Sequence, residues 1–235
     1  MFLCRGGHGV HSPFVFDLIT NVIEEKRRFY CYESLNSVRQ QLKLNNEKIT
    51  YNNRKSTIKH ILKKHCFSER EDKFLFRLAN YFKPEIILVS GSDLGLAPLY
   101  VTSFSKDTCC LVYEPEPSVT SIAYRLIKKY ACSPIYFCDC LSDCLSGKIN
   151  FLNKGYAELI IWNKISPDIF EKLLPFTNND SVIVLSGIRS SSKDKKIWKD
   201  ICSHSNVSVT VDLYNLGIVF FNPKLYRRTY KCVIT

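Results

Sequence analysis

From Pro84 onward, short apolar runs alternate with amphipathic stretches, and this alternation restricts the fold more than any other feature of the chain. The apolar runs are IILV (86–89), CCLVY (109–113), PIYF (134–137), ELIIW (158–162) and SVIVL (181–185). Continuous apolar strands separated by helices are typical of a parallel sheet that is covered by helices on both faces. The sequence therefore predicts an α/β fold with a mainly parallel sheet.

The last part of the chain departs from this alternation. Two further strand-like segments, VSVTVDLY (207–214) and LGIVFF (216–221), are separated only by Asn215. One residue is too short for a crossover helix, so these segments should pair as an antiparallel hairpin. A mainly parallel sheet that ends in such a hairpin is a specific architecture.

The first 65 residues show no strong strand signal, and we expect them to form an N-terminal helical extension (1–65) before an α/β domain (66–235). Ser12 and Pro13 form a helix start, because serine is a good N-cap and proline suits the first turn. Further helices are expected near 56–65 and over EDKFLFRLANYF, which stops before a proline. The polar stretch LKLNNEKITYNNRKS that precedes these two helices is expected to be a connection.

Composition argues against several classes of protein. No apolar run approaches the ~18 residues that a membrane-spanning helix needs. Glycines interrupt the N-terminal MFLCRGGHGV before the apolar core of a signal peptide could form. A cytoplasmic protein without a membrane partner is the expectation. The 11 cysteines form no CxxC pair, and an odd count favours free thiols over a disulfide framework or a zinc site.

The formal net charge of +11 makes nucleic acid a candidate partner. Basic residues are scattered except between positions 54 and 64, where three lysines recur every four residues: Lys55, Lys59 and Lys63. This spacing indicates an amphipathic helix with a basic face. The alternative interpretation is an ordinary solvated surface.

The turn SGSDLG (90–95) follows the first strand of the expected sheet. In such sheets the ligand crevice lies outside the carboxyl ends of the strands. Gly91 and Gly95 would let the backbone approach a ligand, and a following helix start favours an anionic group. The G-x-G-x-x-G fingerprint of dinucleotide-binding enzymes is absent, which argues against hydride transfer. The alternative is a turn needed only for packing.

Two acidic residues follow later strands of the expected sheet. Glu114 ends the second strand, 23 residues after Gly91, where a carboxylate can accept hydrogen bonds from ribose hydroxyls. Asp139 follows the third strand, where it would reach an adenine amino group. A solvent-facing loop glutamate and a helix N-cap are the respective alternatives.

Several motifs together resemble a known family. They are GGHGVHSPFVFDLI near the start, FLFRLANYFKPEIIL leading into GSDLGLAPLY, the SVIVL strand, and VTVDLYNLGIVFF near the end. The chain resembles the class I S-adenosylmethionine-dependent methyltransferase-like proteins common in Bacteroidota, from Gly6 to the C-terminus. The resemblance implies a Rossmann-like methyltransferase fold of seven strands, the last antiparallel. It also implies S-adenosylmethionine as cofactor, in a crevice lined by Gly91, Ser92, Gly95 and Glu114.

The chain departs from the family pattern at three strand ends. Val89 stands where the first strand usually carries an acidic residue. The fourth and fifth strands are followed by Asn163-Lys164 and Ser186-Gly187-Ile188-Arg189, where related O-methyltransferases keep acidic groups for a divalent metal. Hard cations prefer carboxylate oxygens, so no metal is expected. Lys164 and Arg189 either bind an anionic substrate or are exposed replacements that arose after selection on the site relaxed.

Three functional interpretations follow. The first is methyl transfer from S-adenosylmethionine, for example to an oxygen of an unknown small molecule, without a metal. The second is a methyltransferase-like protein that has lost catalysis and serves in binding or regulation. The third is a nucleic-acid-associated protein, which rests on the net charge alone. For the first, we hypothesise that the segment carrying His8 and His11 folds over the crevice as a lid.

Overall fold

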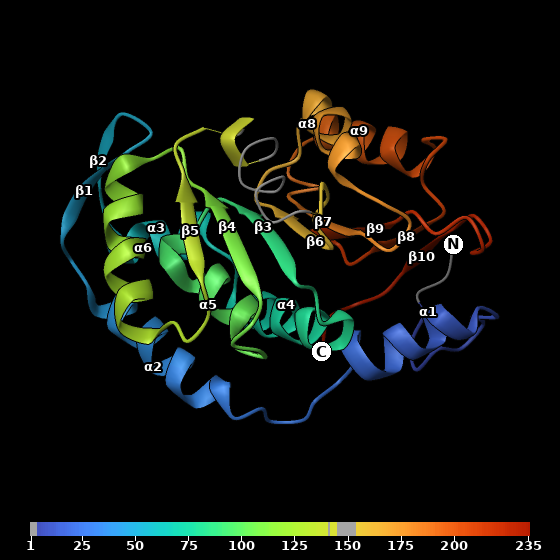
Figure 1. Ribbon diagram of the computed structural model, residues 1–235, viewed down its shortest axis with the longest axis horizontal. Helices are drawn as coiled ribbons and strands as arrows, with labels where there is room; N and C mark the ends of the chain where they lie inside the picture. The colour runs from blue at the N-terminus through green and yellow to red at the C-terminus, as the bar shows by residue number, and fades with distance from the viewer. Residues whose placement is uncertain (1–3, 141, 145–153) are drawn as a thin grey trace. The chain divides into compact units, whose positions relative to one another are not determined.

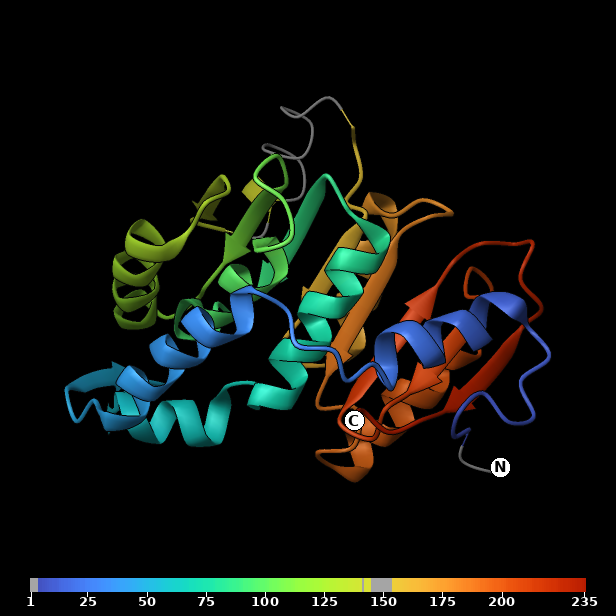
Figure 2. The same cartoon turned by 90° about the horizontal axis from the view of Figure 1, so that it is seen from below.

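The computed structural model describes residues 4–140, 142–144 and 154–235 (Figures 1 and 2). The chain divides into two compact units, which we describe separately. Of the described residues, the first unit comprises 4–26, 84–88 and 154–235, and the second comprises 27–83, 89–140 and 142–144. The strand β3 (Ile86–Ser90) begins in the first unit and ends in the second.

The first unit holds the chain's N-terminal helix and its C-terminal strands. Its helices are α1 (Pro13–Leu18), the π-helix η1 (Ile19–Ile23), α8 (Pro167–Leu173), the 3₁₀-helix η4 (Leu174–Phe176) and α9 (Ser192–Cys202). Its strands, besides the start of β3, are β6 (Leu159–Trp162), β7 (Val182–Ser186), β8 (Val209–Asp212), β9 (Leu216–Phe220) and β10 (Arg228–Lys231).

The second unit contains six of the described helices. They are α2 (Cys31–Leu44), α3 (Ile58–His65), α4 (Glu69–Phe82), the 3₁₀-helix η2 (Asp93–Gly95), α5 (Leu96–Thr102) and α6 (Pro117–Tyr130). Its strands, besides the end of β3, are β1 (Lys48–Tyr51), β2 (Arg54–Thr57), β4 (Cys109–Tyr113) and β5 (Ile135–Cys138).

The strands other than β1 and β2 form an eight-stranded sheet in the order β10-β8-β9-β7-β6-β3-β4-β5. The pairs β4–β5, β6–β7 and β8–β10 are parallel, whereas β9 runs antiparallel to both β7 and β8. The expected hairpin is therefore confirmed, with β9 placed between two strands of the opposite direction. The edge strand β10 is an eighth strand, beyond the seven that the sequence predicts.

The core of the first unit is built on β6, β7 and β9, in which every residue is buried. In Figure 1, α8 and α9 lie on one side of these strands and α1 lies on the other. The ring of Phe14 in α1 contacts that of Phe220 in β9 edge-to-face, with 5.1 Å between centroids. On the opposite side, Trp198 of α9 covers Gly217, where an added Cβ would lie 2.5 Å from the indole ring.

This close approach gives a test of the packing. Gly217→Ala should lower the free energy of unfolding by about 1–3 kcal/mol, because the indole of the buried Trp198 would have to move. Chemical denaturation measures the loss. In a Trp198→Leu background the same alanine should cost much less, since the smaller side chain leaves room for the methyl group. An equal penalty in both backgrounds would contradict the proposed contact.

The second unit has its own apolar core, to which α2, α3, α4, α5 and α6 all contribute. Tyr100 and Phe76 are among its largest fully buried side chains. The helix α4 begins with a capping box, in which Ser68 N donates to the Glu71 carboxylate (2.8 Å) and Glu71 N donates to Ser68 Oγ (3.3 Å). It ends at Phe82, and its C-cap Lys83, directly before Pro84, is left-handed. The helices predicted near 56–65 and 71–82 are confirmed as α3 and α4. Lys55, expected on the basic face of the first helix with Lys59 and Lys63, lies in β2 instead, because α3 begins only at Ile58.

The stretch expected to be a connection instead forms a two-stranded antiparallel hairpin, β1–β2. Asn52 and Asn53 at its tip both have positive φ (48° and 59°), as a type I′ turn requires. Asparagine tolerates this conformation, so the Asn-Asn pair was the overlooked hairpin signal. Thr57 at the end of β2 caps α3 by accepting from His60 N (3.2 Å).

The prediction for the start of the chain is confirmed in part. α1 begins at Pro13 with Ser12 as its N-cap, and η1 continues directly from it. None of the described helices is long and apolar enough to cross a bilayer. Residue 65, the expected end of the N-terminal extension, is the last residue of α3 and lies within the second unit. The domain division at that residue stays a prediction.

Candidate functional site

The turn after β3 has an unusual backbone. Gly91 and Gly95 have φ of 77° and 97°, and between them Asp93 and Leu94 are also left-handed, with φ of 55° and 58°. Left-handed non-glycine residues cost roughly 1–2 kcal/mol each, so the surrounding structure must hold them in place. Such strain is concentrated at functional sites and supports the prediction that this turn is one. Gly91 is half-buried, and its N–H donates to the Tyr113 carbonyl at the end of β4 (2.9 Å).

The structure brings Glu114 and Ser92, two of the predicted site residues, into direct contact. Oε2 of Glu114 accepts hydrogen bonds from Ser92 N (2.8 Å) and Ser92 Oγ (2.7 Å), and its Oε1 accepts from Glu116 N (3.1 Å). Ser92 is fully buried, whereas Glu114 is half-buried. A carboxylate can accept about four hydrogen bonds, so Oε1 keeps capacity for a further donor. Glu114 thus ties the turn to β4 and still presents an acceptor.

Gly95 has a role in packing. It is buried, and a Cβ at this position would lie 3.1 Å from the Cα of Ala123 in α6. Only a residue without a side chain allows η2 and α6 to approach this closely while φ is positive. The packing of α6 therefore accounts for Gly95 without a ligand. Its role in ligand binding stays a prediction.

A buried ionic cluster contacts the turn after β3 through Asp93. Asp93 Oδ1 accepts from Phe67 N (2.9 Å), and Arg39 donates to the Phe67 carbonyl (3.0 Å) and to the carboxylate of Asp72. Arg39, Asp72 and Asp93 are all at most 3 % exposed. One guanidinium faces two buried carboxyl groups, and burial raises the pKa of Asp93 to about 7. These contacts explain how Asp93 is held in its left-handed conformation.

Asp139, the predicted adenine contact, is exposed and directly follows the last residue of β5. That residue, Cys138, forms a disulfide with Cys144, with 5.6 Å between the Cα atoms. The other nine cysteines are free. The expectation of free thiols alone is therefore wrong at one pair. The two cysteines are six residues apart, and only the path of the chain after β5 brings them together.

The residues at the ends of β6 and β7, in the first unit, do not suit a divalent metal. Asn163 and Ser186 offer neutral oxygens, and the Ser186 carbonyl already accepts from Ile165 N (3.0 Å). Among the described residues, no group of three or more histidine, cysteine, aspartate or glutamate side chains is placed to hold a metal ion. Since hard cations need several oxygen ligands, usually including carboxylates, the donor set present here does not fit one.

Arg189 is neither a free anion-binding group nor an exposed replacement. Its guanidinium forms an ion pair with the buried carboxylate of Asp212 at the end of β8, in part through a 3.3 Å bond from Nε to Oδ1. It also lies over the ring of Tyr214, 5.5 Å from the centroid. Arg189 thus joins the loop after β7 to the β8–β9 hairpin. Lys164 is exposed.

The N-terminal motif is fixed within the first unit. Cys4 N donates to the Lys231 carbonyl at the end of β10 (2.8 Å), and Gly6 N donates to both carboxylate oxygens of Glu24 (3.1 and 2.9 Å). His8 and His11 are exposed. The role of this segment as a lid stays a prediction.

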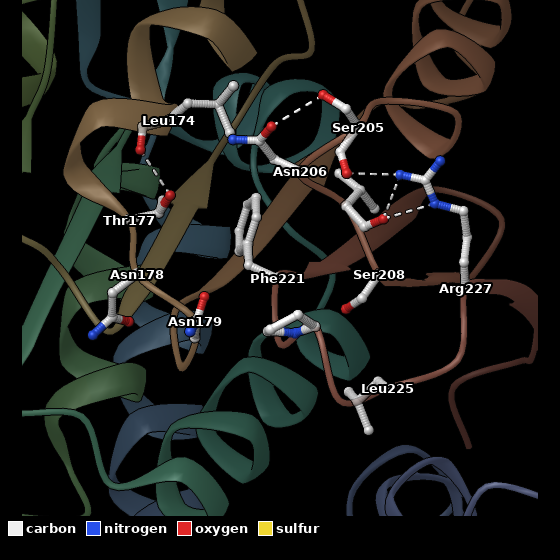
Figure 3. A pocket seen from close by; sticks show the side chains of 12 residues that line it. Leu174, Thr177, Asn178, Asn179, Ser205, Asn206, Ser208, Phe221, Leu225 and Arg227 are labelled. Atoms are coloured by element: carbon white, nitrogen blue, oxygen red, sulfur yellow. Dashed lines mark hydrogen bonds between the residues drawn. The ribbon is translucent and has the colours of Figure 1, made fainter.

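A pocket of about 650 Å³ lies in the first unit, among the segments that precede β7 and β8 and follow β9 (Figure 3). Arg227 at its rim donates from Nε to the Val207 carbonyl (3.0 Å) and from Nη2 to the Ser205 carbonyl (2.9 Å). These bonds hold Nε and Nη2 of the guanidinium against the segment that precedes β8. Ligands of parallel sheets bind at the carboxyl ends of the strands, so a pocket at the amino ends of β7 and β8 is not the expected cofactor crevice.

Comparison with known proteins identifies the fold. No protein-family model and no curated protein matches the sequence. Among solved structures, a methyltransferase of Podospora anserina bound to S-adenosylhomocysteine shares 12% identity over 84% of this chain and 99% of its own, with a TM-score of 0.55. The O-methyltransferase TomG of Streptomyces achromogenes, in complex with S-adenosylmethionine, shares 13% identity over 88% of this chain and 94% of its own (TM-score 0.56).

A third solved structure, the O-methyltransferase of Bacillus cereus in complex with S-adenosylhomocysteine, shares 16% identity over 88% of this chain and 96% of its own (TM-score 0.55). The chain has a Rossmann-like methyltransferase fold. At these identities the likeness establishes the fold and leaves the chemistry to the residues of the site.

Proposed function

We propose that this protein binds S-adenosylmethionine at the turn after β3 and transfers its methyl group to an acceptor. The observation that carries the proposal is Glu114. This half-buried carboxylate is held by Ser92 at the carboxyl end of β4 and keeps an acceptor for a ribose hydroxyl. The methyltransferase fold and the cofactor-bound structures that share it support the same assignment. We take the protein to be a divergent member of the methyltransferase-like group that its sequence resembles.

Each residue would have a distinct part in binding. Gly91, without a Cβ and half-exposed, lets the cofactor approach the turn closely. Glu114 would orient the ribose, and the exposed Asp139 would accept from the adenine amino group. The cofactor supplies an activated methyl group on a sulfonium centre. Methyl transfer then requires mainly that the acceptor be positioned in line, and it does not require a metal.

A second candidate is a protein that binds the cofactor and has lost catalysis. Asn163 and Ser186 favour this alternative, because they stand where related O-methyltransferases keep acidic groups. The two candidates share the binding step and differ only in turnover. Incubation with S-adenosylmethionine labelled on its methyl group and a mixture of cellular small molecules or RNA separates them: label in an acceptor supports the enzyme, and binding without label supports the inactive protein.

The binding step is tested by thermal unfolding with S-adenosylmethionine or S-adenosylhomocysteine, each with and without magnesium. Ligand at about 100 times its dissociation constant stabilises the native state by about 2.7 kcal/mol, which corresponds to a rise in Tm of roughly 5–10 °C for a chain of this size. We expect the same rise with and without magnesium. An unchanged Tm at millimolar ligand would refute cofactor binding, and a rise that needs magnesium would refute the metal-free site.

A further inference from the structure

The positive charge of the protein is concentrated in one part of the second unit. Residues 43–65 carry seven basic residues and one acidic residue, so they contribute +6 of the formal net charge of +11. All seven basic side chains are exposed, and none forms an ion pair with another described residue; they are Lys43, Lys48, Arg54, Lys55, Lys59, Lys63 and Lys64. The acidic residue, Glu47, is paired with Arg125 (3.5 Å). We call these seven side chains the basic surface.

The β1–β2 hairpin and α3 give the basic surface a defined geometry. In the hairpin, Lys48 faces Thr57 and Thr50 faces Lys55, so the two lysines lie on the same face of the ribbon. The helix α3 buries its apolar residues in the core and turns Lys59 and Lys63 outward, one helical turn apart. Residues at this spacing lie about 5–6 Å apart, which allows them to contact neighbouring phosphates of one strand.

The fold also places aromatic rings beside some of these cations. Tyr51 pairs with Arg54 on the ribbon face opposite Lys48 and Lys55. Its ring lies against His65 of α3, with 4.8 Å between ring centroids, and His60 lies 6.5 Å from His65. Both histidines are exposed, and Tyr51 is half-buried. Burial, with His60 and Lys64 nearby, lowers the pKa of His65. Flat rings beside cations are what a nucleobase needs for stacking while its phosphates are neutralised.

A cavity of about 520 Å³ lies beside α3, and Lys43, Lys59 and Lys63 are at its rim. Leu62 and Phe67 supply apolar lining. The two glutamates that also line this cavity already have partners within α4: Glu69 binds Lys73 (2.6 Å), and Glu71 completes the capping box. A cavity lined by apolar side chains and by exposed lysines fits a base whose phosphates stay at the surface.

The basic surface adjoins the proposed cofactor site. Asn52 N at the tip of the hairpin donates to Glu116 Oε1 (3.3 Å), two residues beyond Glu114. Burial and the nearby Cys66 thiol, together with the carboxylates of Glu114 and Glu116, raise the pKa of Tyr51. The hydrogen bond joins the tip of the hairpin to the loop after β4 that carries Glu114, and the shifted pKa of Tyr51 agrees with this proximity.

We infer that the basic surface, together with Tyr51, His60 and His65, binds a single-stranded nucleic acid beside the proposed cofactor site. The bound strand carries the methyl acceptor, and only this last point rests on the proposed function. An anionic membrane fits less well, because Ile58, Ile61 and Leu62 are buried and leave α3 no apolar face to insert. An acidic protein partner would not require the exposed rings.

The test is fluorescence anisotropy with a labelled 12-nucleotide single-stranded RNA, without S-adenosylmethionine, at several salt concentrations. Neutralising three lysines in Lys55→Gln/Lys59→Gln/Lys63→Gln should weaken binding and reduce the slope of log affinity against log salt by about 2. The matched control, Lys193→Gln/Lys195→Gln/Lys196→Gln on the exposed side of α9, removes the same charge elsewhere and should bind as the natural protein does. A His60→Ala/His65→Ala variant should bind about 5- to 150-fold more weakly with little change in slope.

Parallel titrations identify the ligand and separate this inference from the proposed function. The inference would be overturned if both triple variants lost RNA affinity equally, or if no RNA bound at 50 mM salt. A preference for double-stranded RNA would also overturn it, as would tighter lysine-dependent binding to phosphatidylserine vesicles than to RNA. Cofactor binding is measured separately, so RNA binding without cofactor binding refutes only the proposed function, and the reverse refutes only the RNA site.

Discussion

Replacing Asp93 by asparagine is expected to stabilise the protein above pH 7 and to flatten the dependence of its stability on pH. The folded-state pKa of Asp93, about 7, lies above the value of about 4 expected in the unfolded chain. Between these values the folded state binds more protons than the unfolded state, so stability falls as pH rises and levels off above pH 7. Asparagine keeps an oxygen for Phe67 N and tolerates the left-handed conformation.

The comparison is made by urea denaturation at pH 5 and pH 8. The free energy of unfolding of Asp93→Asn, relative to that of the natural protein, should rise by about 2–3 kcal/mol from pH 5 to pH 8. This is the free energy of about two pH units over which Asp93 binds a proton in the folded state but not in the unfolded state. Asp107→Asn, at an exposed aspartate of the same unit, should leave the pH dependence unchanged. If the free energy of unfolding changed with pH in the same way for Asp93→Asn and the natural protein, Asp93 would ionise normally in the folded state.

Arg39→Met should destabilise the protein by about 3–5 kcal/mol at pH 8, because it leaves Asp72, which is fully buried, without its counterion. The loss should be smaller at pH 5. Burial and the neighbouring Asp93 raise the pKa of Asp72, and without Arg39 this carboxyl takes up a proton more readily still. Denaturation curves at the two pH values measure both effects.

Two variants separate the lost charge from lost packing. Asp72→Leu added to Arg39→Met should recover most of the stability, since replacing a buried ion pair by apolar side chains is often neutral. Lys73→Met removes the cation of a half-exposed pair with Glu69 and should cost at most about 1 kcal/mol. A penalty for Arg39→Met that is the same at pH 5 and pH 8 would contradict the ionic account.

The fold was largely predictable from local patterns. Each apolar run after Pro84 forms a strand, and the single residue between the last two runs correctly predicts the β8–β9 hairpin. The sequence does not predict the hairpin β1–β2, because its strands carry few apolar residues and so show no clear period of two. β10 was overlooked because RTYK carries no apolar run and pairs at the sheet edge.

The candidate site was less predictable, because its parts meet only through tertiary structure. The spacing of Gly91 and Glu114 suggested a shared role, and the contact of Ser92 with Glu114 shows that the turn and β4 do meet. No local pattern connects Arg39 with Asp72 and Asp93, or Tyr51 with His65, since each set comes from separate elements. Similarly, the pairing of Arg189 with Asp212 required the strand order of the sheet.

The most direct test of the central claim is a calorimetric titration of S-adenosylmethionine into the natural protein, Glu114→Gln and Glu116→Gln. A charge-assisted hydrogen bond contributes about 1.5–3 kcal/mol, so Glu114→Gln should bind about 10- to 100-fold more weakly. Glu116→Gln keeps an acceptor for Asn52 N and should bind as the natural protein does. No heat of binding to the natural protein at millimolar cofactor, or equal affinity in all three proteins, would contradict a cofactor site at Glu114.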